Sequence, residues 1–253
     1  ILPGYIYPLK SKVIESKCLK PIMIMMEILN TNMQMSDNKQ KKQPKNNIKF
    51  NISLSDEQKR AKENIISHAY SFVVGRAGSG KTLLAVQVAL DMFFKRQYNK
   101  IVITRPTVST EDNGFLPGSE KEKLEPWLVP IMSNMRKVYN KPEKIQKMVE
   151  EEEIELVSLT HFRGRTFDNA VVIVDEFQNL TKAQLRMALG RLGRNSVMIF
   201  CGDNQQVDLK DSFNSAIDDI AKMEPSEHVY KVVLEDNHRH KAINEVLKLL
   251  TGY

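Results

Sequence analysis

The chain has 253 residues, of which 42% are hydrophobic and 27% charged, as is typical of a soluble globular protein. Its two cysteines, Cys18 and Cys201, lie far apart without C-x-x-C spacing, which argues against a zinc site and favours a reduced, cytoplasmic compartment. The net charge of +6 is concentrated in residues 1–47, which hold eight lysines and three acidic residues. The remainder has 29 basic and 28 acidic residues, so any nucleic-acid site on it must be a local patch.

Residues 1–47 are expected to form a flexible basic appendage to a domain spanning 48–253. The polar stretch 39–45 (KQKKQPK) is typical of disorder. The apolar run 22–29 contains Glu27 and is far shorter than the ~20 residues of a transmembrane helix, so no membrane association is expected. A short docking helix, a disordered arm and upstream sequence outside the natural protein all remain open for this segment, since methionines at 23–35 offer several starts.

From residue 48 onward, β-branched strands alternate with helical patterns. The expected strands are 72–74, 101–104, 155–158, 171–175, 197–201 and 229–234, and the expected helices are 56–67, 81–95, 121–139, 142–152, 182–190, 212–223 and 242–251. This alternation predicts an α/β fold with a mostly parallel sheet between helices on both faces. Ligands of such sheets bind at the carboxyl ends of the strands.

A phosphate-binding loop follows the first of these strands. The pattern G-x-x-x-x-G-K-[ST] is complete over residues 75–82, between the apolar run 72–74 and a helix-forming stretch. Glycines let backbone N–H groups approach the phosphates, and the helix N-terminus points at them. We expect Lys81 to reach the β- and γ-phosphate oxygens and the Thr82 hydroxyl to bind Mg²⁺. The residues expected to contact the nucleoside triphosphate are Gly75, Arg76, Ala77, Gly78, Ser79, Gly80, Lys81 and Thr82.

Two acids end the apolar run 171–174 and complete the predicted nucleotide site. A buried strand delivers Asp175 at its carboxyl end, where it can bind Mg²⁺ opposite Thr82. The adjacent Glu176 can polarise an attacking water, which favours hydrolysis over transfer to a small acceptor. Gln178 lies two residues further on, where it can sense the γ-phosphate, although an ordinary exposed glutamine is the alternative.

Further polar candidates lie before and after these motifs. Asp203 and Gln206 follow the strand 197–201, where a carboxylate and an amide can lie beside the γ-phosphate. Gln58 precedes the phosphate loop on an expected helix and can read the adenine edge with its paired donor and acceptor, or else be a solvated helix residue. Ser55 before Asp56 is typical of a helix N-cap.

Arginines near strand ends are candidates for contacts with phosphate or nucleic acid. They are Arg105, Arg163, Arg165 and Arg239. Solvated surface arginines are the alternative for each of them. An arginine that neutralises transition-state charge is often supplied by a neighbouring subunit, so Arg239 need not face its own nucleotide.

The ordered motifs resemble the PhoH-like ATPase family, named for phosphate starvation. The matching segments are GRAGSGKT (75–82), TRP (104–106), GFLPG (114–118), RGRTF (163–167), VVIVDEFQN (171–179), GDNQQVDL (202–209) and RH (239–240). The resemblance covers residues 50–253. The sequence departs from the family pattern at Phe177, where the family often has Ala, and at Asn237-His238, which replace an apolar pair.

This resemblance implies a single RecA-like domain, similar to the first motor domain of superfamily 1 helicases, with ATP and Mg²⁺ as ligands. It also implies ATP hydrolysis coupled to RNA or single-stranded nucleic acid, with helicase or remodelling activity, and it adds Asp208 and Arg239 to the site. Because one such domain cannot close over ATP, we expect a homo-oligomer, a ring for which a hexamer is one arrangement.

Three other functions are weighed against an ATPase. An ATP-gated RNA-binding switch that unwinds no strand is the main alternative, with the basic residues 1–47 supplying affinity. A small-molecule kinase is disfavoured by Glu176 and Gln178 beside the metal-binding acid. A GTPase is disfavoured because no N-K-x-D motif is present.

Overall fold

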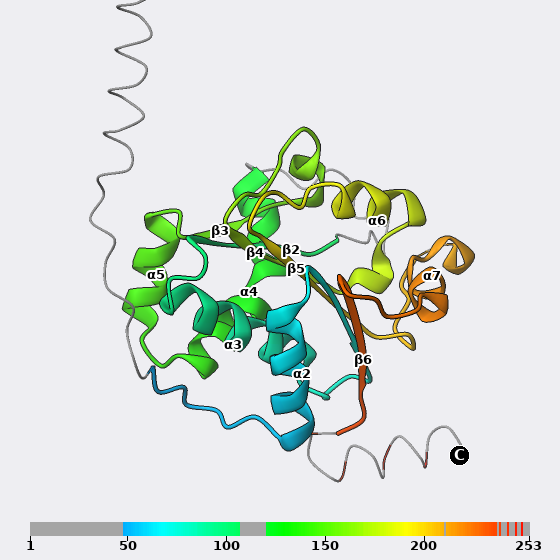
Figure 1. Ribbon diagram of the computed structural model, residues 1–253, viewed down its shortest axis with the longest axis horizontal. Coiled ribbons are helices and arrows are strands. Elements are labelled where there is room, and N and C mark those ends of the chain that lie inside the picture. Colours follow the sequence, from blue (N-terminus) through cyan, green and yellow to red (C-terminus); the bar gives the residue numbers. More distant parts are fainter. Residues whose placement is uncertain are drawn as a thin grey trace, which may run out of the picture. The chain divides into compact units, whose positions relative to one another are not determined.

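The computed structural model describes residues 48–106, 120–209, 211–236, 238, 242, 246 and 249, with the side chains of 120–128 excepted (Figure 1). The expected N-terminal appendage, the GFLPG motif and Arg239 lie outside the described residues. Most of the expected helix at 242–251 lies outside them too.

A parallel sheet of six strands forms the centre of the described part, in the order β3-β2-β4-β5-β1-β6. The strands are β1 Tyr70–Gly75, β2 Lys100–Thr104, β3 Ile154–Leu156, β4 Ala170–Asp175, β5 Val197–Gly202 and β6 Val229–Leu234. Each corresponds to a strand expected from the sequence, so the predicted α/β fold with a parallel sheet is confirmed.

Helices cover both faces of this sheet (Figure 1). One face carries α2 Asp56–Ser67, α3 Lys81–Phe94, α4 Glu120–Val138 and α5 Pro142–Glu150. The other carries α6 Lys182–Leu189, α7 Ile217–Lys222 and the short 3₁₀ helices η1 Leu159–Phe162 and η2 Phe177–Asn179. Among the helices described, none has the length and apolar character needed to cross a membrane.

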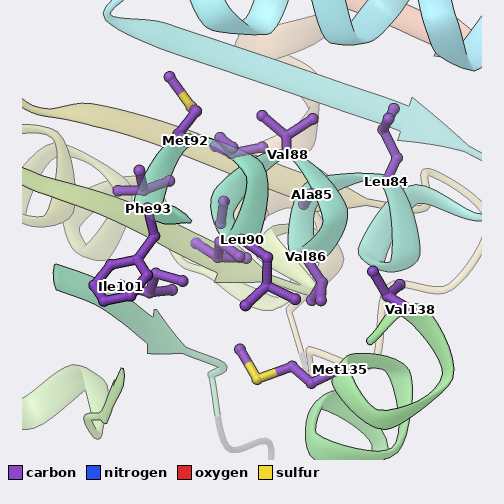
Figure 2. Close-up of a cluster of buried hydrophobic side chains, with 14 of the residues drawn as sticks. Leu84, Ala85, Val86, Val88, Leu90, Met92, Phe93, Ile101, Met135 and Val138 are labelled. Atoms are coloured by element: carbon purple, nitrogen blue, oxygen red, sulfur yellow. The ribbon is translucent and has the colours of Figure 1, made fainter. Parts of the chain in front are cut away.

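The strand residues alternate between two hydrophobic clusters because successive side chains of a strand point to opposite faces. In β4, Val171 and Ile173 pack with α3, whereas Val172 and Val174 pack on the other side. Helix α3 is buried from Leu84 to Phe94, so its side chains contact both the sheet and α4 (Figure 2). This deep burial fixes the N-terminus of α3, which carries the end of the phosphate loop.

The helix expected over 212–223 is interrupted. A 3₁₀ turn, η3 Ser212–Asn214, precedes α7, and the residues between them bond to another segment. The Ser215 hydroxyl donates to the Gln178 carbonyl at 2.6 Å, and the Ala216 N–H donates to the Leu180 carbonyl at 2.9 Å. These tertiary bonds override the local helical preference.

The parallel register brings the carboxyl ends of four strands to one edge. Asp175 of β4 lies opposite Cys201 of β5, and Val74 of β1 lies opposite Gly202. On the other side of β4, Val174 pairs with Thr104 at the end of β2. The predicted site residues that follow these strands are therefore neighbours in space.

Candidate nucleotide-binding site

The phosphate loop connects β1 to α3 and has the backbone that its glycines permit. Gly78 and Gly80 adopt φ angles of 93° and 80°, in the left-handed region that other residues avoid. The Lys81 ammonium donates to the carbonyls of Gly75 at 2.6 Å and Arg76 at 3.0 Å. The cationic head of Lys81 is therefore held over the loop, at the N-terminus of α3.

The phosphate loop and strand β4 are joined by a short hydrogen bond. The Thr82 hydroxyl donates to Asp175 Oδ1 at 2.8 Å, so the two residues predicted to bind Mg²⁺ lie side by side. Asp175 is only 3% exposed. Burial and the neighbouring Glu176 raise the pKa of Asp175 to about 6, partly offset by Thr82 and Arg105.

Glu176 leaves the strand in an unusual conformation. Its φ of 53° and ψ of 42° are left-handed, which is strained for a residue with a side chain and is found most often at functional sites. Its two carboxylate oxygens contact different partners. Gln178 donates to Oε2 at 2.7 Å, and the Arg105 guanidinium lies 3.4 Å from Oε1.

Gln178 connects the ends of β4 and β5. It is 1% exposed, and its amide nitrogen also donates to the Gln206 carbonyl at 3.0 Å. Its amide oxygen accepts from the Asp203 N–H at 3.0 Å. Asp203 is buried as well, whereas Gln206 is exposed. Gln178 is thus a buried link beside the acids rather than the exposed glutamine that was its alternative.

Two further side-chain pairs stabilise this edge. Asn179 and Asp208 exchange two hydrogen bonds, at 2.8 and 3.2 Å. Arg76, which is exposed in the phosphate loop, donates to Gln205 Oε1 at 3.1 Å. Asp208 therefore contacts the segment after β4, and the loop is tied to the segment after β5.

Gln58 lies under the phosphate loop and forms a capping box with Ser55, the expected N-cap of α2. Its amide nitrogen donates to the Ser79 carbonyl at 3.2 Å and lies 3.2 Å from His238 Nε2. Gln58 is 3% exposed, so it is not the solvated helix residue that was its alternative. His238, one of the departures from the family pattern, also donates its backbone N–H to Gly78 at 3.0 Å.

The candidate arginines have different surroundings. Arg105 lies beside both acids, with Nη1 3.8 Å from Asp175 Oδ2. Arg165 forms two bonds to Glu155, at 2.7 and 2.9 Å, and lies over the Phe167 ring. Arg163 is exposed. The structure brings Arg105 to the predicted site, while Arg165 is engaged in an internal ion pair.

Thr82 and Asp175 fit Mg²⁺. They present a hydroxyl and a carboxylate, the hard oxygen donors that Mg²⁺ prefers, and the raised pKa shows that the positive charge of Arg105 does not fully compensate the buried carboxylate. Within the described residues no cluster of three or more His, Cys, Asp or Glu side chains is placed to hold a metal. Magnesium in nucleotide sites takes one or two protein ligands and completes its shell with phosphates and water, so this pair suffices.

Two contacts at this edge were not expected from the sequence. Arg105 at the acids depends on β2 lying next to β4, which sequence spacing does not reveal. The capping box of Gln58 has a signal, S-x-x-Q at 55–58, that identifies its role in α2 but not its contact with the loop. Phe177, the other departure from the family pattern, is fully buried and packs edge-on against Phe72 and Phe200.

A parallel sheet with a phosphate loop after one strand and an acidic pair after another defines the class of P-loop nucleoside triphosphatases. The chain belongs to the PhoH-like protein family, whose sequence model matches residues 52–251. The family resemblance of the motifs is thereby confirmed.

Relatives from several bacteria support the assignment. A PhoH-like protein of Mycobacterium leprae is 34% identical over 201 residues, covering 78% of this chain and 57% of the relative. A PhoH-like protein of Synechocystis is 44% identical over 146 residues, covering 57% and 44%. Protein PhoH of Escherichia coli is 38% identical over 150 residues, covering 58% and 42%. The chain thus spans about half the length of these curated relatives.

Among solved structures, the Pif1 helicase of Candida albicans resembles the chain with a TM-score of 0.42 and 18% identity, over 79% of this chain and 44% of that one. At this level the likeness adds nothing about function.

Proposed function

We propose that this chain is a Mg²⁺-dependent ATP hydrolase whose turnover is coupled to RNA or single-stranded nucleic acid. The observation that carries this proposal is the 2.8 Å bond between Thr82 and Asp175, since it joins the phosphate loop to the acidic strand with Glu176 as the next residue. Support for the nucleic-acid partner comes from membership of the family, the exposed Arg163 and the basic charge of residues 1–47.

Each side chain of the site has a separate role in hydrolysis. Lys81 contacts the β- and γ-phosphates, and Thr82 and Asp175 hold Mg²⁺, which when bound supplies positive charge to the phosphate oxygens. Glu176 orients the attacking water and accepts its proton at a carboxylate oxygen.

The remaining polar residues bind or sense the nucleotide. Gln178 and Gln206 sense the γ-phosphate, with Asp203 and Asp208 supporting that edge of the site. Gln58, beneath the loop, reads the adenine edge once its amide releases the bonds that it makes to Ser55 and Ser79.

The first test is ATP turnover with and without single-stranded RNA. Glu176→Gln removes the proton acceptor while keeping the shape, so turnover should fall by a factor of about 10² to 10⁴. Glu63→Gln, an exposed change on α2, is the matched control and should leave turnover unchanged. RNA should stimulate the wild type. If ATP binds but is not hydrolysed in either condition, the ATP-gated RNA-binding switch becomes the better description.

We also propose a homo-oligomeric ring, for which a hexamer is one arrangement, in which Arg239 acts on a neighbouring subunit's nucleotide. Arg239→Ala subunits keep intact acids, and Glu176→Gln subunits keep the arginine. Mixing two such inactive proteins should restore part of the turnover if Arg239 acts between subunits. Mixtures that stay inactive, or a fully active monomer in sedimentation experiments, would contradict this arrangement.

A further inference from the structure

Both oxygens of Glu176, the proposed proton acceptor, have protein partners. Gln178 Nε2 donates to Oε2 at 2.7 Å, and Arg105 Nη2 lies 3.4 Å from Oε1. A general base needs one oxygen turned towards its water. Each carboxylate oxygen can accept more than one hydrogen bond, but both are partly covered here, so moving one of the two partners opens an oxygen more fully to water.

The two partners differ in how firmly they are held. Gln178 is 1% exposed, and its amide makes three hydrogen bonds that connect β4 to the segment after β5. Arg105 has a side chain that is 23% exposed, and its ion pairs to the two acids, at 3.4 and 3.8 Å, are its only polar contacts to the described residues. Arg105 is the partner that can leave at small cost.

Charge gives a reason for Arg105 to leave. Its Nη1 lies 3.8 Å from Asp175 Oδ2, while Thr82 occupies Oδ1 of the same carboxylate. A divalent cation bound by Thr82 and Asp175 would lie close to the guanidinium, and the repulsion between like charges is strong at a site of low solvent exposure. Arg105 and Mg²⁺ therefore compete for one buried carboxylate.

We propose that Arg105 is a positioning residue that holds Glu176 Oε1 and competes with Mg²⁺ for Asp175, and that Mg²⁺-nucleotide displaces it. This inference rests on the proposed function, because it requires Mg²⁺-nucleotide to bind at this edge. Its consequence is that Glu176 Oε1 becomes more open to water in the loaded site. An arginine first considered for nucleic-acid contact thus acts as a restraint on hydrolysis.

The test measures how much Mg²⁺ is needed for half-maximal binding of a fluorescent, non-hydrolysable ATP analogue to the full chain. Arg105→Gln removes the competing charge, so the Mg²⁺ requirement should fall about fivefold, the size expected for a partly exposed ion pair. Arg105→Lys keeps the charge and should stay within about twofold of the wild type. Arg194→Gln removes an exposed arginine before β5, at the opposite edge of the sheet, and should change nothing.

Each failure has a distinct meaning. If Arg105→Gln is folded by its thermal unfolding curve and needs as much Mg²⁺ as the wild type or more, the competition is refuted while the proposed function stands. If the wild type binds no ATP analogue at any Mg²⁺ concentration, the proposed function itself fails.

The contact with Glu176 is tested by a double-mutant cycle. If Glu176 anchors the guanidinium, Arg105→Gln should lower the Mg²⁺ requirement less in a Glu176→Gln background than in the wild type. Equal shifts in both backgrounds would show that Glu176 does not hold Arg105.

Discussion

A buried aspartate lies near each end of helix α3, and the pKa values of these two carboxylates are shifted in opposite directions. Near the C-terminus of α3, Asp91 is 6% exposed and is paired with Lys62 at 2.6 Å and Lys95 at 3.0 Å. Burial favours the neutral acid, but the two lysines outweigh it and the pKa of Asp91 is lowered. At the N-terminus, Asp175 has one hydroxyl at 2.8 Å and one guanidinium at 3.8 Å, and its pKa is raised to about 6, mainly by burial.

The difference separates a structural ion pair at Asp91 from the proposed ligand site at Asp175. Asp91 finds its two counter-charges within the chain, and its lowered pKa means that the charged carboxylate stabilises the folded state. Asp175 lies beside Glu176, a second acid, and is charged at a cost to folding that a ligand can offset. The same residue type at similar burial is therefore compensated by lysines at one end of α3 and is left for a proposed ligand at the other.

The largest expected effect is that of Asp175→Asn. Because the change removes a proposed metal ligand, ATP turnover should fall by a factor of at least about 10². Because it also removes a poorly compensated buried charge, the free energy of unfolding should stay equal or rise by about 1 kcal/mol. Turnover and urea unfolding measured on the same preparation check both parts. A variant that loses stability would show that the Asp175 charge is needed by the fold.

Asp91→Asn should show the reverse pattern. Losing the charge leaves Lys62 and Lys95 without their partner, and the free energy of unfolding should fall by about 1–3 kcal/mol. ATP turnover per folded molecule should stay within about twofold. If Asp91→Asn abolished turnover at full stability, the contrast between the two ends of α3 would be wrong.

Packing at the carboxyl edge should also be sensitive to a single methyl group. A Cβ at Gly202 would lie 2.6 Å from the Phe177 ring and 3.0 Å from Gln178 Oε1. Gly202→Ala should therefore destabilise the protein by about 1–2 kcal/mol and slow turnover by displacing Gln178. Gly190→Ala is the control, because its Cβ would meet its nearest atoms at 3.7 Å. Equal thermal unfolding temperatures for the two variants would contradict this.

The smallest effect is a pH dependence at Asp91. Its pKa is lower in the folded state than the value of about 3.9 for an unfolded aspartate, so the unfolded chain binds more protons as the pH falls. The stabilisation is complete above the unfolded pKa and is lost as the pH falls through the folded pKa. Urea unfolding should be measured from pH 3 to pH 7 for the wild type and Asp91→Asn. The difference between their free energies of unfolding should be constant above about pH 5 and should become smaller below about pH 4. A difference in free energy of unfolding that stays constant over the whole pH range would contradict a lowered pKa of Asp91 in the folded state.

The strands and the nucleotide motifs were predictable because their signals are local. Apolar runs ending in polar residues predicted the order of strands along the chain, and the loop at 75–82 and the acids at 175–176 have fixed spacing. The helix over 56–67 was predicted to the residue, since Ser55 is a strong N-cap signal.

The contacts between segments were not predictable in the same way. The position of Arg105 beside Glu176 depends on the order of strands within the sheet, and the break before α7 depends on the bond from Ser215 to Gln178. Such contacts join residues tens of positions apart and have no local pattern. The roles of all the site residues in nucleotide binding and hydrolysis, Gln206, Asp208 and Arg239 included, stay predictions.

The most direct test of the proposed catalytic site at the N-terminal end of α3 is phosphate release from Mg²⁺-ATP by the wild type and Glu176→Gln, with nucleotide affinity measured alongside. We expect release by the wild type and release at least about 100-fold slower from the variant, with affinity for Mg²⁺-ATP within a few-fold of the wild type. Equal rates of release from the two proteins would contradict a catalytic role for Glu176 and for this edge of the sheet.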